Sequence, residues 1–484
     1  MGSSDKPRLT RRKALQLGAA GMLASVGSLQ ALAQPPRRTA RAAPDGLPIV
    51  QFDMAGYLPP AEDVGGTLFQ LGPVYTLFLT SRLMRPPTTA DQRALAAALN
   101  TIEAQYPYRP SGIFTCVAYG LPYFNGLPGG ANGDLVAGHM PRLLLDKRRY
   151  ALEEAVPAPT DVSPDNPDVS RATFNIPLAI EQNDILLTLR SDVQENLMDV
   201  AAWISGSGIL AGAALPSPRL DLLELTSTRL MFVQPGLPRR VAEAENLPYA
   251  GRIPPDSPLW MGFASHQADS SGTAASATFE GTASVRFTSA VAGDYFAGGS
   301  IQHLSHMILD LGQWYADDQP YLERVQQMFR SNPPPATGYA DQFAEGGGPV
   351  FLANVFKGRD DARQNAIGEQ TLDGTRRIGH SSALQRASRA ADGTPFHVRG
   401  DGAGFDSMDT PSGDKLPKLH FSMFVPTAEV FERMRRYQAA TDLATAYDVP
   451  PRHAGIERFT TVTRRQNFLV PPREHRAFPL LELL

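Results

Sequence analysis

The chain has 484 residues, of which 42% are hydrophobic and 19% charged, and its formal net charge at pH 7 is −4. This slightly acidic balance argues against nucleic acid as a partner, because affinity for phosphates needs a basic face. The only cysteine, Cys116, excludes an intramolecular disulfide, and its apolar surroundings favour simple core packing of the thiol. The length predicts two or three folded domains.

The N-terminal residues have the pattern of an export signal. A twin-arginine pair at Arg11 and Arg12 precedes a weakly apolar run, and Ala31–Ala33 offers a small-residue cleavage site. A membrane anchor would need a longer uninterrupted apolar span. We therefore expect residues 1–33 to be a twin-arginine signal peptide that is cleaved after export. The twin-arginine machinery would deliver a protein without a stable membrane span to the periplasm or the extracellular space.

The mature chain begins with an extended lead-in and continues as a first folded half. Residues 34–60 are rich in proline and arginine and lack periodicity, whereas residues 61–234 alternate strand and helix patterns. The order of elements is typical of a ferredoxin-like unit. The expected elements are a helix over 89–106 with a capping-type start, strands over 112–120 and 184–190, a helix over 192–204 capped by Asp192, and a strand over 223–234.

A proline-rich and charged stretch, 235–258, is expected to link this half to a second one, 259–484. The second half repeats the order loosely. Its expected elements are a helix over 320–329, strands over 350–355 and 419–425, a helix over 427–445 and a hairpin over 458–470. We therefore predict an α+β protein of the dimeric α+β barrel type. It would consist of two ferredoxin-like halves with antiparallel sheets and flanking helices.

Charged side chains and two histidines gather in the stretch 376–409, which has many glycines, lacks a long apolar run and is expected to be a loop. The neutral imidazole of His380 is of the kind that binds a haem iron. Arg399, downstream of it, offers a fixed positive charge that can stabilise a cleaving peroxide. Two other interpretations remain open. A lone histidine in a loop is more often an ordinary hydrogen-bonded residue, and Gly379–Ala383 nearly fits a hydrolase nucleophile elbow but lacks the preceding strand.

Several separated stretches resemble the dye-decolourising peroxidases, in the order in which that family has them. The stretch around His380 and Arg399 is similar to the family's proximal-histidine and distal-arginine region. The matching pieces are Asn183–Asp192, Trp260–Phe263, Gly299–Trp314, Gly379–Arg389, Phe396–Gly402, Leu419–Phe424 and Asn467–Pro471. The resemblance implies that haem b is bound, with His380 as the axial ligand of its iron. It also implies that hydrogen peroxide oxidises an organic reducing substrate, with Arg399 at the distal side.

The chain departs from the pattern of this family at two places. Ser265 stands where the family has its distal aspartate, so we expect the acid–base role to fall to water positioned by Arg399 or to a nearby acid such as Asp401. Arg386 and Arg389 are not at the usual offset, so no contact to a haem propionate is carried over. These departures favour an alternative, in which an exported haem-binding or other binding protein has kept the fold without turnover.

A second alternative is a metal-dependent hydrolase. His303 and His306, with Asp310, would present two imidazoles and a carboxylate to one metal ion if their segment were helical. If the segment were a strand, the two histidines would face opposite sides. The remaining histidines show no paired spacing and are given no role: His139, His266, His397, His420, His453 and His475.

Overall fold

The computed structural model describes residues 29–34, 46–64, 67–158, 160–161, 171, 173–263, 272–283, 285–318, 321–328, 377–388, 390 and 394–484. Three predictions lie outside these residues, or mostly so. They concern the twin-arginine segment, Ser265 and the strand over 350–355.

A ten-stranded sheet forms the centre of the molecule and closes into a barrel, because β10 pairs with β13 on one side and β14 on the other. All ladders around the barrel are antiparallel, and only the short strand β5 pairs in parallel. The overall class is therefore mixed α and β. The strands are β3 (Tyr75–Leu83), β4 (Phe114–Gly120), β5 (Ala179–Ile180), β6 (Ile185–Ser191), β9 (Leu223–Phe232), β10 (Ser300–Leu309), β11 (Val398–Arg399), β12 (Gly402–Asp406), β13 (Leu416–Val425) and β14 (Thr460–Val470).

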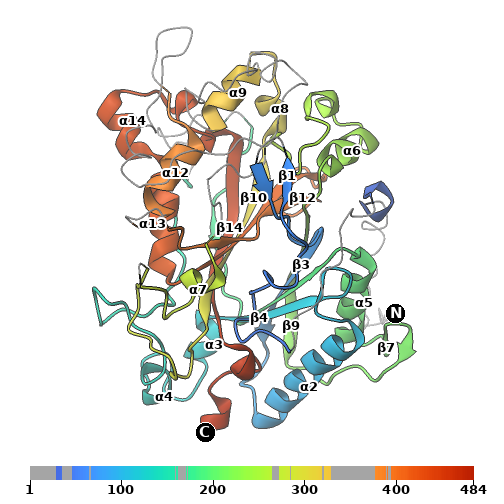
Figure 1. Cartoon of the computed structure of the whole chain (residues 1–484), viewed down its shortest axis with the longest axis vertical. Helices are drawn as coiled ribbons and strands as arrows, with labels where there is room; N and C mark the ends of the chain where they lie inside the picture. The colour runs from blue at the N-terminus through green and yellow to red at the C-terminus, as the bar shows by residue number, and fades with distance from the viewer. Residues whose placement is uncertain are drawn as a thin grey trace, which may run out of the picture.

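Helices cover the outside of this barrel in two groups (Figure 1). The first group lies beside strands of the first half and consists of α2 (Thr89–Gln105) and α5 (Gln194–Ile204). The second group contains α9 (Tyr321–Met328), α12 (His380–Ser388), α13 (Ala428–Ala439) and α14 (Thr441–Tyr447). Shorter helices are α3 (Leu121–Asn125), α4 (Asp134–Ala137), α6 (Leu237–Ala244), α7 (Ala274–Ala277) and α8 (Leu311–Trp314), and two-stranded sheets are formed by β1 (Glu62–Val64) with β2 (Thr67–Phe69) and by β7 (Ile209–Leu210) with β8 (Ala213–Ala214).

The helix predicted over 89–106 is confirmed as α2, and its start shows why it forms there. Thr88 is the N-cap, and its backbone N–H donates a hydrogen bond to the Asp91 carboxylate, which completes a capping box. Arg85 forms an ion pair with Asp91 at 2.7 Å. This hydrogen-bonded guanidinium outweighs the opposite effect of burial and holds the pKa of the Asp91 carboxyl well below its usual range. Leu95, Leu99 and Ile102 fall on the buried face.

Three local predictions were wrong. The expected hairpin over 458–470 is one long strand, β14, because its residues pair along β10 and then with β4. The expected helix over 427–445 is broken at Ala440, which has a φ of 54°. Asp192 does not cap α5, since its carboxylate accepts a hydrogen bond from the Val74 amide instead.

The barrel interior is apolar at its centre. Side chains from both halves meet there: Phe52, Phe78, Cys116, Ala118, Leu186, Met231, Leu304, Phe424, Phe468 and Val470. The Cys116 thiol is thus a packing group, as predicted, and burial raises its pKa to about 12. Because strands of both halves enclose this core, the two halves share one hydrophobic core.

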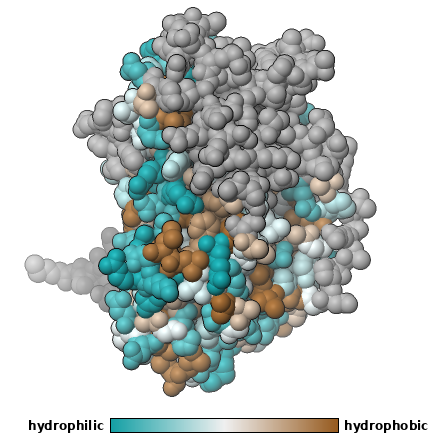
Figure 2. Space-filling view, turned by 60° about the vertical axis from the view of Figure 1, so that its left-hand side comes forward, coloured by the Kyte–Doolittle hydropathy of each residue, from teal (hydrophilic) through white to brown (hydrophobic). Residues whose placement is uncertain are grey.

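The stretch 235–258, expected to be a linker, contains α6 and a 3-10 turn whose Leu237, Val241 and Ile253 join a large core cluster. On the face that Figure 2 shows, the described side chains form small hydrophobic groups separated by hydrophilic ones. Among the helices that the structure describes, none is long and apolar enough to cross a bilayer.

Candidate functional site

The stretch that carries His380 is not the loop that was expected. It contains α12, β11 and β12, and α12 packs against α13 through Leu384 and Ala387. The apolar side chains of α12 are few, but their spacing places them on one helical face. Glycine-rich flanks concealed this short amphipathic helix in the sequence.

His380 begins α12 and is held beside the turn at Gly455. The β-bridge between Ile378 and Ala454 holds the backbone before His380 next to this turn. Gly455 has a φ of 58°, a backbone conformation that glycine adopts easily. Within the described part of the chain, His380 Nδ1 is buried without a hydrogen bond. Burial lowers the pKa of His380 to about 4. The imidazole is therefore neutral at pH 7 and keeps a lone pair for a ligand.

Charges around His380 come from three elements. The Glu457 carboxylate raises the His380 pKa, whereas Arg435 and Arg399 lower it, so the structure brings the Arg399 charge within electrostatic reach of His380. Arg399 lies on β11, opposite Met423 of β13. Asp401 lies between β11 and β12 and is partly buried. The structure records no hydrogen bond or ion pair between Asp401 and another described residue.

A buried ion network fills the space between α13 and the sheet. Arg435 contacts Asp161 and Glu457 at 2.8 Å each, and Arg465 contacts Asp161 at 2.6 Å. Burial by itself would raise the pKa of both carboxyls, but the guanidinium groups outweigh it and hold both pKa values below their usual range. Thr160 donates a further hydrogen bond to Glu457. All four charged side chains are therefore ionised and matched.

His303 of β10 lies on the outer face of the sheet, the face that α13 and this ion network cover. Its Nδ1 donates to the Asn467 amide oxygen at 2.6 Å, and its Nε2 accepts from the Ser305 hydroxyl at 2.6 Å. Its ring stacks on Phe431 of α13 with ring centres 3.3 Å apart. Burial, and then the Arg465 charge, hold the His303 pKa well below its usual value. No planar group lies between these two stacked rings.

His306 lies on the opposite face of the same strand, so the proposed metal pair with His303 was wrong. Strand side chains alternate, and the odd spacing of the two residues separates them. His306 instead faces His420, its direct cross-strand partner on β13. His306 Nε2 lies 3.5 Å from Asp406 Oδ1, and His420 Nε2 lies 3.2 Å from Asp406 Oδ2.

Two irregularities of the sheet shape this cluster. Gly404 of β12 leaves room for the His420 ring to lean toward Asp406, because a Cβ at Gly404 would lie 2.4 Å from His420 Nε2. A register shift between β10 and β14 next to His306 makes Thr463 an extra residue. Its hydroxyl lies 2.8 Å from His306 Nδ1 and 2.8 Å from Asp409 Oδ2.

The sequence was compared with known proteins. A family of unknown function, DUF7405, matches residues 148–472, which is more than half of the chain. The chain belongs to the DUF7405 family. No curated protein matches the sequence of this DUF7405 member.

Among solved structures, the DUF7405 chain is similar to several dye-decolourising (DyP-type) proteins at low identity. A DyP-type peroxidase from Cellulomonas bogoriensis has 13% identity and a TM-score of 0.46, over 83% of this chain and 92% of that one. A DypB variant from Rhodococcus jostii RHA1 in complex with heme has 14% identity and a TM-score of 0.44, over 84% and 96%. The dye-decolorizing protein from V. cholerae has 13% identity and a TM-score of 0.42, over 88% and 98%.

Sequence reasoning missed Asp406, Asp409, His420 and Thr463 in the DUF7405 chain. His420 had been given no role because no second ligand lies at a helical or turn spacing from it. The only local signal was a polar residue at every second position within β13, at Lys418, His420 and Ser422. Such a pattern indicates a polar interior face but does not identify the partner strand.

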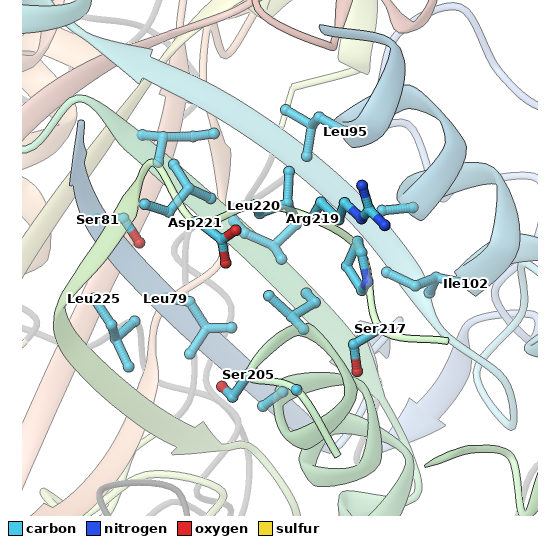
Figure 3. Close-up of a pocket in the computed structure, with 18 of the residues that line it drawn as sticks. Leu79, Ser81, Leu95, Ile102, Ser205, Ser217, Arg219, Leu220, Asp221 and Leu225 are labelled. Carbon is cyan, nitrogen blue, oxygen red and sulfur yellow. The ribbon is translucent and has the colours of Figure 1, made fainter. Parts of the chain in front are cut away.

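A separate cavity of about 1270 Å³ lies over the first half of this DUF7405 chain. Apolar side chains of α2, α5 and the sheet line it, including Leu79, Leu95 and Ile102, and the loop that carries Arg219 and Asp221 borders it (Figure 3). None of its lining residues comes from the segment that carries His380 or from the histidine cluster. The cavity is therefore distinct from both.

Proposed function

We propose that this DUF7405 protein is an exported, haem-dependent peroxidase that oxidises an organic donor with hydrogen peroxide. The observation that carries the proposal is His380, a neutral imidazole with an unsatisfied buried nitrogen beside the Arg399 charge. The sequence resemblance to dye-decolourising peroxidases assigns the same two residues. Twin-arginine export, which suits proteins that fold around a cofactor, is part of the proposal.

The donor set of this site fits haem b. An uncharged imidazole is the usual axial ligand of a haem iron, and His380 keeps its lone pair at neutral pH. The rings of His303 and Phe431 stack directly on each other, so the haem would not lie between these two rings. When bound, haem supplies the redox chemistry that peroxide reduction and donor oxidation require.

The residues of the chain would orient the peroxide and manage its protons. Arg399 stays charged at any physiological pH, so it can hold a peroxide and stabilise negative charge as the O–O bond breaks. Asp401 would hold the proton that leaves the peroxide, because Ser265 lacks an ionisable group in the neutral range. The network of Arg435 and Glu457 would keep the His380 segment in place.

The test of the proposal is haem retention by His380→Ala. The wild-type protein, produced with a haem supply, should show a Soret band that the variant loses, because the axial bond is removed. The control is His453→Ala, a partly buried histidine on the neighbouring turn, which should keep the band. A normal histidine-ligated spectrum in His380→Ala would exclude His380 as the ligand.

The cavity over the first half favours a second candidate function, a binding protein for an apolar small molecule. Its volume is somewhat larger than that of typical ligand sites and its walls are mostly apolar. A fluorescent apolar dye such as anilinonaphthalene sulfonate would then bind to the wild type. Ala98→Trp, inside the cavity, should abolish binding, whereas Ala97→Trp, on the exposed side of α2, should not. Equal binding by both variants would contradict this function.

A further inference from the structure

The cluster at one end of the barrel has the spacing of a metal site. His306, His420 and Asp406 each offer a ligand atom within 4.8 Å of the other two, and the distances from the two Nε2 atoms to the Asp406 carboxylate are 3.5 and 3.2 Å. An ion bound tetrahedrally at about 2.0–2.1 Å from each ligand atom separates those atoms by about 3.3–3.4 Å. The two distances, each to a different oxygen of the Asp406 carboxylate, lie on either side of this value.

Hydrogen bonding alone does not account for the arrangement. Neither His306 Nε2 nor either nitrogen of His420 makes a hydrogen bond within the described residues, although both side chains are fully buried. A buried polar nitrogen without a hydrogen bond costs free energy of folding, so a bound partner is expected at such a site. The carboxylate of Asp406 faces both Nε2 atoms but forms a well-directed hydrogen bond with neither.

The bonds behind His306 fix its tautomer. The Thr463 hydroxyl has one proton, and it lies 2.8 Å from the Asp409 carboxylate, which can only accept. Thr463 therefore donates to Asp409 and accepts from the Nδ1–H of His306. The His306 Nε2 then carries a lone pair that points at a carboxylate oxygen. Two acceptors face each other, and a cation between them resolves the conflict.

We infer that His306, Asp406 and His420 bind a divalent first-row transition metal ion. Thr463 and Asp409 orient His306, as hydrogen-bonded carboxylates commonly do behind metal-bound imidazoles. The Asp406 side chain is 31% exposed, which leaves a further coordination position accessible to water or a small ligand. Asp406 and Asp409 lie in the same stretch as His380, 376–409, but the set includes neither His380 nor Arg399.

The chemistry of the ligands selects the class of ion. Two imidazoles and one carboxylate suit Zn²⁺, Co²⁺ or Fe²⁺, whereas Mg²⁺ and Ca²⁺ prefer oxygen ligands. Positive charge nearby opposes any cation, but Arg229 is paired with Glu181 at 2.5 Å and Arg464 with Asp409 at 2.7 Å. The Lys418 ammonium donates to the Met408 carbonyl and the Thr410 hydroxyl.

Titration of tag-free protein with Co²⁺ tests the inference, because the visible spectrum of Co²⁺ reports its coordination. We expect one Co²⁺ per chain, displaced by Zn²⁺ but not by Mg²⁺. His420→Ala should lose this binding. Thr463→Val, which keeps the shape and all three ligands, should weaken it by about 10–100-fold. His139→Ala, a partly buried histidine far along the chain, is the matched control.

The His380→Ala variant separates this inference from the proposed function. Co²⁺ binding should persist in that variant, whether or not wild-type protein takes up haem. Circular dichroism and thermal unfolding verify that each variant is folded. Asp406→Asn changes a second ligand while keeping the size of the side chain. If folded wild-type protein takes up no Co²⁺, or if His420→Ala and Asp406→Asn both bind as tightly as wild type, the cluster is a structural ion pair only.

Discussion

Four histidines of the second half differ in what surrounds their ring nitrogens. Both nitrogens of His303 are satisfied by Asn467 and Ser305, which makes this residue a packing group. His306 is satisfied at Nδ1 alone, and His420 at neither nitrogen within the described residues. His380 Nδ1 has no hydrogen bond to any residue that the structure describes, and the charges of Glu457, Arg435 and Arg399 act on the ring. The partners, and not the residue type, therefore separate packing histidines from candidate ligand-binding ones.

At the scale of single residues, we expect Arg399→Ala to keep haem but to react with peroxide more slowly, by about 10²–10³-fold. Loss of one oriented donor to a developing negative charge typically has this effect. Arg399→Lys should recover only part of the rate, because an ammonium lacks the planar fork of donors. Stopped-flow mixing with hydrogen peroxide measures both variants. A parent-like rate in Arg399→Ala would show that another group acts on the peroxide.

Single elements show how far local patterns reach. The capping box of α2 lies within seven consecutive residues together with its supporting ion pair, from Arg85 to Asp91. β10, in contrast, places His303 and His306 on different faces, and this result depends on the strand conformation of the whole segment. A short stretch thus determines a helix start, but it does not determine what a strand face contacts.

At the scale of one element, we expect Thr88→Ala to destabilise the protein by about 1 kcal/mol, because an amide at the start of α2 loses its cap. Thr89→Ala, the exposed neighbouring residue inside the helix, should change stability much less. Urea unfolding followed by circular dichroism compares the two variants. Equal losses for both would mean that the cap contributes nothing measurable to stability.

The whole molecule depends on contacts between distant parts of the chain. The ion network joins Asp161 of the first half to Arg435, Glu457 and Arg465 of the second. The barrel likewise closes through β9 with β12 and β4 with β14. The two halves therefore share one sheet and one buried charge network, so we expect them to unfold together.

At this scale, Asp161→Ala should destabilise the protein by about 3–5 kcal/mol, since Arg435 and Arg465 would lose a buried counter-charge. Asp146→Ala, which breaks an exposed ion pair with Arg148, should change stability far less. Denaturant titrations at pH 7 give both values. A small loss in Asp161→Ala would show that water reaches the network.

The buried histidines predict a pH dependence of stability. His303 has a folded-state pKa well below its unfolded value near 6.5, so below that pH the unfolded chain binds a proton that the folded chain does not. Stability is therefore full above pH 6.5 and falls as the pH drops, by about 1.4 kcal/mol at pH 5.5 for such a residue. Urea unfolding at pH 7.5 and 5.5 tests this. His303→Gln should reduce the difference, and an unchanged slope would assign it to other groups.

The sequence by itself determined the elements whose signals are local. The helix over 89–106 and the strands around residues 114–120, 185–191 and 223–232 appear where they were expected. Caps, apolar periodicity and β-branched runs act over a few neighbouring residues, so the chain carries this information at each position. The choice of His380 and Arg399 as candidates also came from the sequence, through family resemblance.

Only the tertiary structure decided which distant residues meet. β14 became one strand because β10 and β4 offered it partners, and the stretch around His380 became a helix because α13 covered its few apolar residues. The cluster of His306, Asp406 and His420 needs three strands in one register, and Thr463 reaches it through a bulge. Register and barrel closure are set by pairing between remote segments, and a one-residue shift would turn each of these side chains to the other face.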